Sequence, residues 1–326
     1  MSSHPIPIVD FTPFLDGSAK QQAADQLLES FKSAGFVYLT NFGIPEGEVS
    51  EMFGWLKHFF ALSHETKMLA PHPDSGSHHR GYSYPCQEKE IQYSDSGDEF
   101  TIAPPSMKES FECGSEDNDF MPNIWPPEGV FPGFKEACLS FFWKCHEVEQ
   151  NILRALALGF GLEEEWFLRY HETANSQLRL HHYPSISSEL LETNKLTRIS
   201  AHTDFDTLTF LFQGEIGGLE VEDPNEPGKY AAVPPIPNSI VLNAGDFLRR
   251  WSNDTIRSTM HRVVAPPGVV AKDGLLPSRY SIPYFCAPDM SMIIDAIPGT
   301  WSADQPKKYE PVSVKEYAMK RFAANY

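Results

Sequence analysis

Two histidines and one aspartate in the second half of the sequence have the side chains of a metal site. His202 and Asp204 stand two apart in SAHTDFDTLTFLFQ (200–213), and His261 follows much later in STMHRVV. Two imidazoles and one carboxylate on one side of a metal leave its other positions open, an arrangement suited to non-haem iron(II). The same residue types also bind zinc. A histidine within a strand is, in addition, often only part of the core or the surface.

The stretch that carries His202 and Asp204 raises a problem of burial. Every second residue of 208–212 is apolar, which is typical of a strand with a buried face. If the chain stays extended, His202, Asp204 and Asp206 point to that same face. A buried charge is costly unless it is paired or bound to a metal. The pattern therefore predicts either a strand end in solvent or a metal site beside the core.

A possible anion site follows in RYSIPYF (279–285). Arg279 and Ser281 share a face if the strand is regular, and Phe285 lies farther along it. An arginine that points inward needs an anion, and a carboxylate bound through two hydrogen bonds is the natural one. A structural Asp or Glu is the alternative partner. Pro283 in the same run predicts an edge position or a bulge.

The first half of the chain is rich in helical patterns. Apolar residues at helical spacing predict helices over 23–34, 49–60 and 134–156. The last is the longest and is expected to end at Gly159 or Gly161 and to pack behind the core. The segment 71–127 is rich in Pro, Gly, Ser and acidic residues, which indicates long loops with short elements.

The second half has a different pattern. From about residue 176 to 298, short runs of period two alternate with Gly, Pro, Asn and Asp, which indicates a β-sandwich or barrel. We therefore expect an α+β protein with a helix- and loop-rich region over 1–170 and a β-rich region over 171–326.

Composition limits the partners. The 326 residues carry 26 Lys plus Arg against 44 Asp plus Glu, a formal net charge of −18, so nucleic acid is not expected to bind. An anionic small ligand would need a local cation. The five cysteines include no CxxC pair, as expected of a reduced, cytoplasmic protein. Neither a secretory signal nor a membrane-spanning run is expected. The oligomeric state is left open.

Taken in chain order, a set of segments resembles one enzyme family. They are IPIVDF, GFVYLTNFGIP, HETKM, RGYSY, KESFECG, AHTDFDTLTFLFQ, GGLEVED, NAGDFLRRWSND, STMHRV and RYSIPYFCAPD. Together they resemble the isopenicillin N synthase-like family of iron(II)/2-oxoglutarate-dependent dioxygenases. The resemblance implies a double-stranded β-helix (jelly-roll) core, preceded by a mixed helical region and followed by a C-terminal helix.

The resemblance also implies roles for individual residues. His202, Asp204 and His261 match the catalytic iron ligands, and Arg279 and Ser281 match the pair that binds the distal carboxylate of 2-oxoglutarate.

Two further matches lie in neighbouring motifs. Tyr183 in LRLHHYP matches a tyrosine near the co-substrate, and Phe285 matches a position that often lines the substrate pocket. Three features depart from the family. Asp206 stands where glycine is usual, His181 stands where asparagine is common, and the interval 265–277 after His261 looks like an inserted loop. None of the three removes a ligand.

The implied activity is oxidation of a small organic molecule, expected to be a specialised metabolite, with Fe(2+), 2-oxoglutarate and O2, and ascorbate as a supporting reductant. Succinate and CO2 are released, and the outcome is hydroxylation, desaturation or ring rearrangement. Three alternatives remain at this point: an iron oxidase of the same fold that does not use 2-oxoglutarate, a zinc hydrolase, and a binding protein without catalytic activity.

Overall fold

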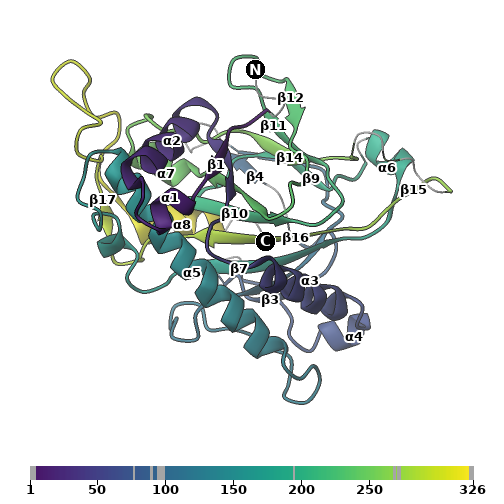
Figure 1. Ribbon diagram of the computed structural model, residues 1–326. Coiled ribbons are helices and arrows are strands. Elements are labelled where there is room, and N and C mark those ends of the chain that lie inside the picture. The colour runs from purple at the N-terminus through teal and green to yellow at the C-terminus, as the bar shows by residue number, and fades with distance from the viewer. Residues whose placement is uncertain are drawn as a thin grey trace.

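The computed structural model describes residues 5–75, 78–88, 91–93, 100–193, 195–266, 269 and 273–322, with the backbone alone for 91–93, 100–102 and 192 (Figure 1). The helices are α1 Thr12–Leu15, α2 Lys20–Ser33, α3 Glu46–Phe60, α4 His64–Lys67, α5 Phe134–Gly159, α6 Ser188–Glu192, α7 Asp246–Trp251 and α8 Val314–Phe322. A short 3-10 helix spans Leu168–Tyr170.

Two sheets form the centre of the molecule. The larger has eight strands, which in spatial order are β1 Ile8–Asp10, β2 Phe36–Thr40, β13 Ser239–Ala244, β10 Leu208–Gln213, β16 Arg279–Cys286, β7 Gln177–Tyr183, β6 Glu109–Cys113 and β3 Gly81–Ser83. The smaller has four: β12 Tyr230–Ala232, β11 Leu219–Glu222, β14 His261–Val263 and β9 Ile199–His202. Three two-stranded pairs join β15 Leu275–Leu276 to β8 Ile186–Ser187, β17 Ile293–Ile294 to β18 Val312–Ser313, and β4 Ile91–Tyr93 to β5 Phe100–Ile102.

The two large sheets pack face to face. Tyr38 and Val241 of the larger sheet share a buried cluster with Val221 and Val263 of the smaller one. This cluster is the interior of a jelly roll, so the predicted α+β class with a jelly-roll core is confirmed. The larger sheet takes strands from both regions expected from the sequence, because β2 pairs with β13. The segment 1–170 is therefore part of the same packed body.

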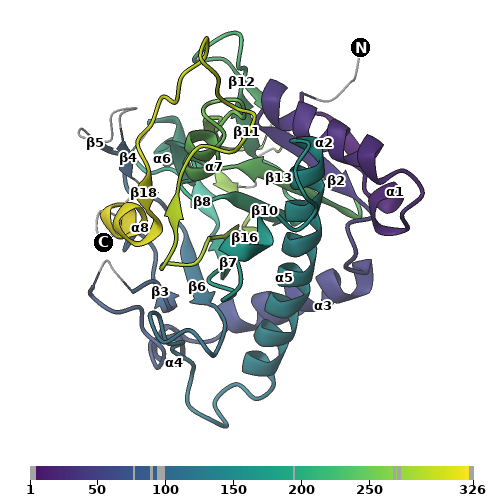
Figure 2. The ribbon, with the colours of Figure 1, turned by 90° about the vertical axis from the view of Figure 1, so that its left-hand side faces the viewer.

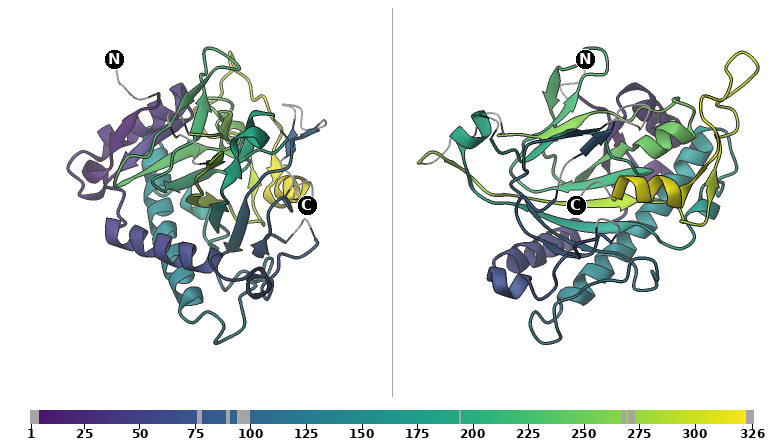
Figure 3. Two further views of the ribbon diagram at one scale, coloured as in Figure 1. Left: turned by 90° about the vertical axis from the view of Figure 1, so that its right-hand side faces the viewer. Right: turned by 180° about the vertical axis from the view of Figure 1, so that it is seen from behind.

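Helix α5 covers the outer face of the larger sheet, as its apolar stripe predicts. It begins at Phe134 and ends at Gly159, one of the two expected ends. The ring of Phe141 lies 5.2 Å from that of Phe212 on β10, measured between centroids. Figures 2 and 3 show α8 on the other side of the sheets from α1 and α2. The helices predicted over 23–34 and 49–60 correspond to α2 and α3.

The condition under which the polar and the apolar residues of 200–213 would share a face, one extended strand, is not met. His202 ends β9 in the smaller sheet, whereas Leu208 begins β10 in the larger sheet, and residues 203–207 cross between them. Side-chain parity is lost in the crossing. Phe212 consequently packs outward against α5, while Thr209 and Leu211 line an interior cavity.

The expectation for Pro283 is also wrong. Strand β16 lies inside the larger sheet, between β10 and β7, and its register with β10 is unbroken. Pairing with β7 stops after Ser281 and resumes at Tyr284 in the same register. Proline has no N–H to donate, so the ladder loses bonds there without a bulge. Arg279, Ser281 and Phe285 therefore keep the common face that the sequence predicts.

The loop-rich segment 71–127 has the short elements that its composition predicts, namely β3, β4, β5 and β6 in the described part. The interval 265–277, expected to be an inserted loop, lies partly outside the described residues; Leu275–Leu276 form β15. None of the helices described is both long and apolar enough to cross a bilayer.

Gly35 follows α2 and packs against the segment that leads to His261. It adopts φ +72° after α2, and an added Cβ would lie 2.8 Å from the carbonyl oxygen of Arg257. A side chain there meets both left-handed strain and a backbone clash. We expect Gly35→Ala to lower the free energy of unfolding by about 2 kcal/mol or more, measured by denaturant unfolding.

Gly54 is the matched control for this prediction. It lies within α3, and an added Cβ meets nothing within 4 Å. Gly54→Ala should be neutral or stabilising by up to about 1 kcal/mol because alanine favours a helix. Equal effects of the two substitutions would contradict the role given to Gly35.

Candidate functional site

The three expected metal ligands lie together inside the jelly roll. His261 at the start of β14 pairs directly with His202 at the end of β9, which sets their rings 4.3 Å apart between centroids. Asp204 follows in the crossing between the sheets. Its Oδ1 atom lies 3.6 Å from Nε2 of His202 and 3.7 Å from Nε2 of His261. Ligand atoms of all three residues lie within 4.8 Å of one another.

The surroundings of Asp204 fix which of its oxygens faces the histidines. Thr209 Oγ1 donates to Oδ2 at 2.6 Å, and Asn243 Nδ2 donates to the same atom at 2.7 Å. Because both donors bind Oδ2, Oδ1 is the oxygen that faces the two histidines. Such outer contacts orient a ligand and raise metal affinity.

Backbone carbonyls orient both imidazoles. Nδ1 of His202 lies 2.9 Å from the carbonyl oxygen of Ser200, and Nδ1 of His261 lies 3.2 Å from that of Thr259. A carbonyl oxygen can only accept, so each Nδ1 carries the proton. In the neutral form of each ring Nε2 is the atom without a proton, and both Nε2 atoms face Asp204.

Electrostatics put the triad in the state that a metal needs. Burial and the neighbouring His202 lower the pKa of His261 to about 4, so this ring is neutral at pH 7. Burial alone would raise the pKa of Asp204, but His261, His202 and Thr209 hold it well below its usual range. A neutral His261 and a buried carboxylate, with the His202 imidazole beside them, fit a divalent metal such as iron(II).

A buried arginine marks an anion site beside the triad. Arg279 is 1% exposed, and its Nη1 donates to Ser281 Oγ at 3.0 Å. Its Nε and Nη2 have no hydrogen-bond partner, and no acidic side chain pairs with it in the described parts of the chain. The expected alternative, a structural Asp or Glu, is thus not found there. Because an unpaired buried cation is costly, this guanidinium fits an anionic ligand.

Strands β7 and β16 arrange the site along one face. Arg279 pairs with Tyr183, Ser281 with His181 and, farther along, Phe285 with Gln177. Directly paired residues share a face of the sheet. Along this inner face Arg279 therefore comes first, Ser281 follows it, and Phe285 lies at the far end.

Two cavities open onto this face. The smaller, of about 60 Å³, is lined by the triad together with Tyr183, Arg279 and Ser281. The larger, of about 160 Å³, also reaches His202 and Asp204. His181 and Phe285 line both. Phe285 is only half-buried and lies outside the core clusters.

A charged wall of the larger cavity was not foreseen from the sequence. Arg179 donates from Nη1 to Glu88 at 2.9 Å, and Lys108 lies 2.8 Å from the other oxygen of Glu88. Arg80 lines the same cavity, while Glu112 pairs from behind with Arg179 Nε at 3.1 Å. Among the described residues of this wall, three cations thus face two carboxylates, an excess of positive charge in an otherwise acidic chain.

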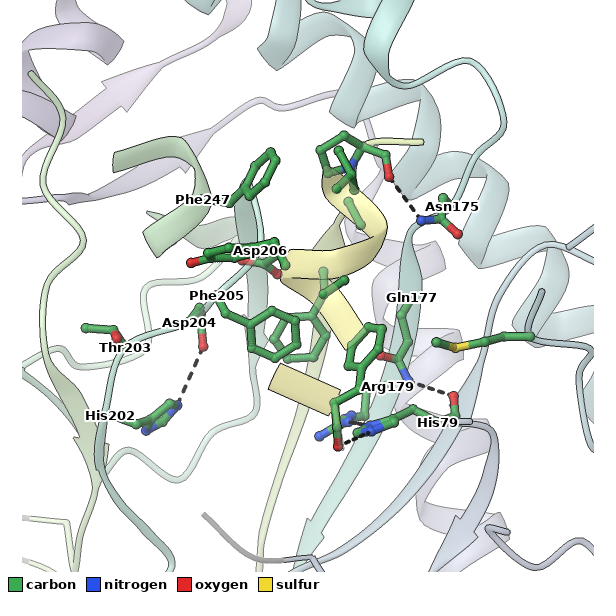
Figure 4. Close-up of a pocket in the computed structure, with 18 of the residues that line it drawn as sticks. His79, Asn175, Gln177, Arg179, His202, Thr203, Asp204, Phe205, Asp206 and Phe247 are labelled. Carbon is green, nitrogen blue, oxygen red and sulfur yellow. Dashed lines mark hydrogen bonds and ion pairs between the residues drawn. The ribbon is translucent and has the colours of Figure 1, made fainter. Parts of the chain in front are cut away.

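The opposite wall is aromatic. Phe205 and Phe247 face the cavity across from Arg179 in Figure 4. Helix α8 adds Phe322, whose ring lies 5.3 Å from that of Phe205 between centroids. The sequence placed a helix at the C-terminus but gave no sign that it reaches the cavity, because that contact joins segments more than a hundred residues apart.

Asp206, one of the departures from the family, is buried beside the triad. It shares Thr209 with Asp204, at 3.3–3.4 Å from Thr209 Oγ1. Burial and the charge of Asp204 raise its pKa well above the usual range. The turn that contains it is closed by Gly245, where an added Cβ would lie 2.7 Å from Asp206 Oδ1.

A second group of metal-capable side chains occurs among the described residues, His72, His79 and Glu112. All three are buried. Glu112 already pairs with Arg179 Nε at 3.1 Å and accepts a hydrogen bond from Gln177 at 3.0 Å. Both oxygens of Glu112 therefore already have partners, Oε1 in Arg179 and Oε2 in Gln177.

Comparisons with known proteins agree with this geometry. A family model for the 2OG-Fe(II) oxygenase superfamily matches residues 174–288, and one for the N-terminal region of non-haem dioxygenases in morphine synthesis matches 6–128. The 2-oxoglutarate-Fe(II) type oxidoreductase ppzD of Metarhizium rileyi is 36% identical over 323 residues, covering 98% of this chain and 90% of that one. The proline hydroxylase buaE of Petromyces alliaceus is 37% identical over 322 residues, covering 98% of each.

A solved structure extends the likeness to three dimensions. A full-length Neurospora crassa protein, crystallised in complex with alpha-KG and thymine, superposes with a TM-score of 0.87 at 40% identity, covering 98% of this chain and 96% of that one.

The contact from Asn243 to Asp204 gives a test of the metal centre. Asn243→Ala removes one of the two donors on Oδ2, so the carboxylate loses its fixed orientation. We expect the Kd for iron(II), measured anaerobically, to rise about 10- to 100-fold in a folded protein. Ser239→Ala, on the same strand but away from the triad, should bind iron(II) like the wild type. Unchanged affinity in Asn243→Ala would contradict the orienting role.

Proposed function

The chain belongs to the 2OG-Fe(II) oxygenase superfamily, and from this premise we propose that it oxidises a C–H bond of a small, carboxylate-bearing specialised metabolite. It is an iron(II)- and 2-oxoglutarate-dependent dioxygenase. Bound iron(II), with 2-oxoglutarate and O2, supplies the oxidising power, and succinate and CO2 are released. Within the proposal, His202, Asp204 and His261 hold the iron.

The smaller cavity is assigned to 2-oxoglutarate. Arg279 presents two nitrogens without a partner, and Ser281, which accepts from Nη1, keeps its own hydroxyl proton to donate. A carboxylate bound between them would be neutralised and doubly hydrogen-bonded. Tyr183 closes this end, with the Arg279 guanidinium 4.8 Å from its ring centroid.

The net positive wall of the larger cavity is the observation that carries the substrate class. Burial would raise the pKa of Glu88, but Arg179 and Lys108 hold it well below its usual range, so the cluster keeps its charges. A substrate carboxylate at this wall would balance the excess cation. The apolar part of the substrate would then lie against Phe285, whose ring centroid lies 5.4 Å from the Arg179 guanidinium. The name of the proline hydroxylase buaE gives proline as its substrate, and proline combines a carboxylate with an apolar ring.

A second candidate is a neutral ring compound. The Neurospora crassa structure at 40% identity holds thymine, which has no carboxylate and offers ring carbonyls as acceptors. The cationic wall could donate hydrogen bonds to the ring carbonyls of such a compound, but its excess positive charge would not be neutralised.

The proposal also includes two expectations about the whole chain, its cellular compartment and its division into two regions. All five cysteines are free thiols, which supports a reduced, cytoplasmic setting. The division into 1–170 and 171–326 falls within the interval 129–173, which neither family model matches.

A ligand panel tests the substrate class without changing the protein. With iron(II), O2 and 2-oxoglutarate present, succinate release and oxidised product are measured together for L-proline, L-prolinamide and thymine. We expect coupled turnover with the carboxylate and a KM at least about tenfold higher for the amide, because only the carboxylate neutralises the wall. Coupled turnover of thymine with none of proline would favour the second candidate. If no compound stimulates succinate release, larger carboxylates are tested against their amides in the same way.

Arg279 tests the co-substrate assignment. Arg279→Ala should raise the Kd for 2-oxoglutarate by a factor on the order of 30 or more, since truncating one partner of a buried charge pair typically costs ~2–5 kcal/mol. Arg279→Lys should recover only part, because lysine lacks the planar fork. Normal 2-oxoglutarate binding with lost substrate affinity would instead show that Arg279 binds the organic substrate, as in relatives that do not use 2-oxoglutarate.

A further inference from the structure

Asp206 carries a buried carboxyl group that receives no hydrogen bond from another described side chain. The residue is 7% exposed and lies in the crossing between the two sheets. Its two oxygens lie 3.3–3.4 Å from Thr209 Oγ1. That hydroxyl has a single proton, which it gives to Asp204 Oδ2 at the shorter distance of 2.6 Å. Thr209 is therefore a donor to Asp204 and not to Asp206.

The protonation state of Asp206 does not change this requirement. An ionised Asp206 has two oxygens that accept. A protonated Asp206 can donate its proton to Thr209 Oγ1, but its carbonyl oxygen still only accepts. In both states a buried oxygen lacks a donor from the other residues that the structure describes, which is costly. The position therefore fits a ligand that brings a hydrogen-bond donor.

The place of Asp206 assigns that ligand to one of the two cavities. Asp206 lines the larger cavity, and it does not line the smaller one that is assigned to 2-oxoglutarate. In Figure 4 it lies between Phe205 and Phe247, on the side of the cavity away from Arg179. The larger cavity thus has cations on one wall and a carboxyl group among aromatic rings on another. The donor to Asp206 is expected to come from the organic substrate.

The surroundings of Asp206 favour nitrogen as the atom that donates. Asp204 and Asp246 lie close enough to act on Asp206 by their charge. A hydroxyl oxygen would bring its own lone pairs to this group of carboxylates, whereas a protonated amine or a ring N–H presents only the donor. The aromatic rings of Phe205 and Phe247 also attract the positive end of an N–H group.

We propose that Asp206 is a specificity-determining residue that accepts a hydrogen bond from an N–H group of the organic substrate. Both candidates of the proposed function carry such a group, proline in its amine and thymine in its ring. Glycine, which is usual at this position in the family, has no side chain for this contact. The inference rests on the assignment of the larger cavity to the organic substrate, which the comparison of L-proline with L-prolinamide tests separately.

The experiment compares ligands that differ at the nitrogen. The full chain, loaded with iron(II) and 2-oxoglutarate, is titrated anaerobically with L-proline and with tetrahydrofuran-2-carboxylate, in which oxygen replaces the ring nitrogen. Thymine and its N,N′-dimethyl derivative form a second pair. The wild type should bind the N–H member of at least one pair about 10- to 100-fold more tightly, the usual effect of a hydrogen bond to a charged group. The pair that shows the preference identifies the nitrogen as an amine or a ring N–H.

Variants of Asp206 assign this preference to its side chain. Asp206→Ala should bring the ratio of the two Kd values in that pair close to one, because only the N–H member loses a partner. A general structural effect would weaken both members and leave the ratio unchanged. Asp206→Asn keeps one accepting oxygen and should keep part of the preference. It also provides the test if the alanine variant does not fold.

Asp246→Asn is the matched control. Asp246 is a buried acid of the same region, but it lines neither cavity and accepts from Thr203 Oγ1 at 3.1 Å. This variant should keep the wild-type ratio of Kd values. A ratio that falls as far in Asp246→Asn as in Asp206→Ala would indicate a change in local charge and count against a direct contact.

The remaining outcomes separate the inference from the proposed function. Equal wild-type affinities within both pairs, or no binding of any of the four ligands, would overturn the inference. A preference that persists in Asp206→Ala would overturn it too, because another acceptor would then bind the nitrogen. A preference for N–H ligands without any preference for L-proline over L-prolinamide would keep the inference and remove the carboxylate from the proposed function. The reverse result would remove the inference alone.

Discussion

Charges buried away from water are the constraint on which the rest of this structure depends. Asp204 and Arg279 both lie inside the jelly roll, and neither pairs with the other. Each would be costly alone in a medium of low dielectric constant. A divalent cation at the triad and a dianion beside Arg279 would neutralise both. The protein therefore holds a carboxylate and a guanidinium, of opposite charge, at two ends of one cavity. The free energy of binding the two ligands offsets the cost of burying these charges.

The pairing of β7 with β16 fixes the positions of the residues around the buried arginine. Two adjacent strands with a fixed register place Tyr183, His181, Ser281 and Arg279 on one inner face. The loss of ladder bonds at Pro283 does not shift that register, so Phe285 stays on the same face. Rigid strands hold such groups more exactly than loops do. The proposed metal ligands, by contrast, come from the smaller sheet and the crossing that follows it, so the site forms only where the two sheets meet.

The outer layers hold this arrangement in place and shape the larger cavity. Helix α5 packs on the outer face of the larger sheet, and Glu149 of α5 accepts from the hydroxyl of Tyr284 on β16 at 2.8 Å. Within the cationic wall Glu88 binds Arg179, and from behind it Glu112 binds the same guanidinium. Helix α8 completes the aromatic wall from the end of the chain. The specificity of the larger cavity is therefore set by segments from both halves of the sequence.

The sequence by itself determined the family, the helices with strong apolar periodicity, and the residue types of the site. These depend on local spacing and on an ordered set of motifs, which a linear reading preserves. It could not decide whether 200–213 is one strand, and it misjudged the place of Pro283, because side-chain parity holds only within one strand and strand order is a long-range property. Only the tertiary structure decided that Arg179, Lys108 and Phe322 share a cavity, and that Asp206 lines the same cavity. The reason is physical: hydrogen bonds and charge pairs between distant segments exist only after the sheets have packed.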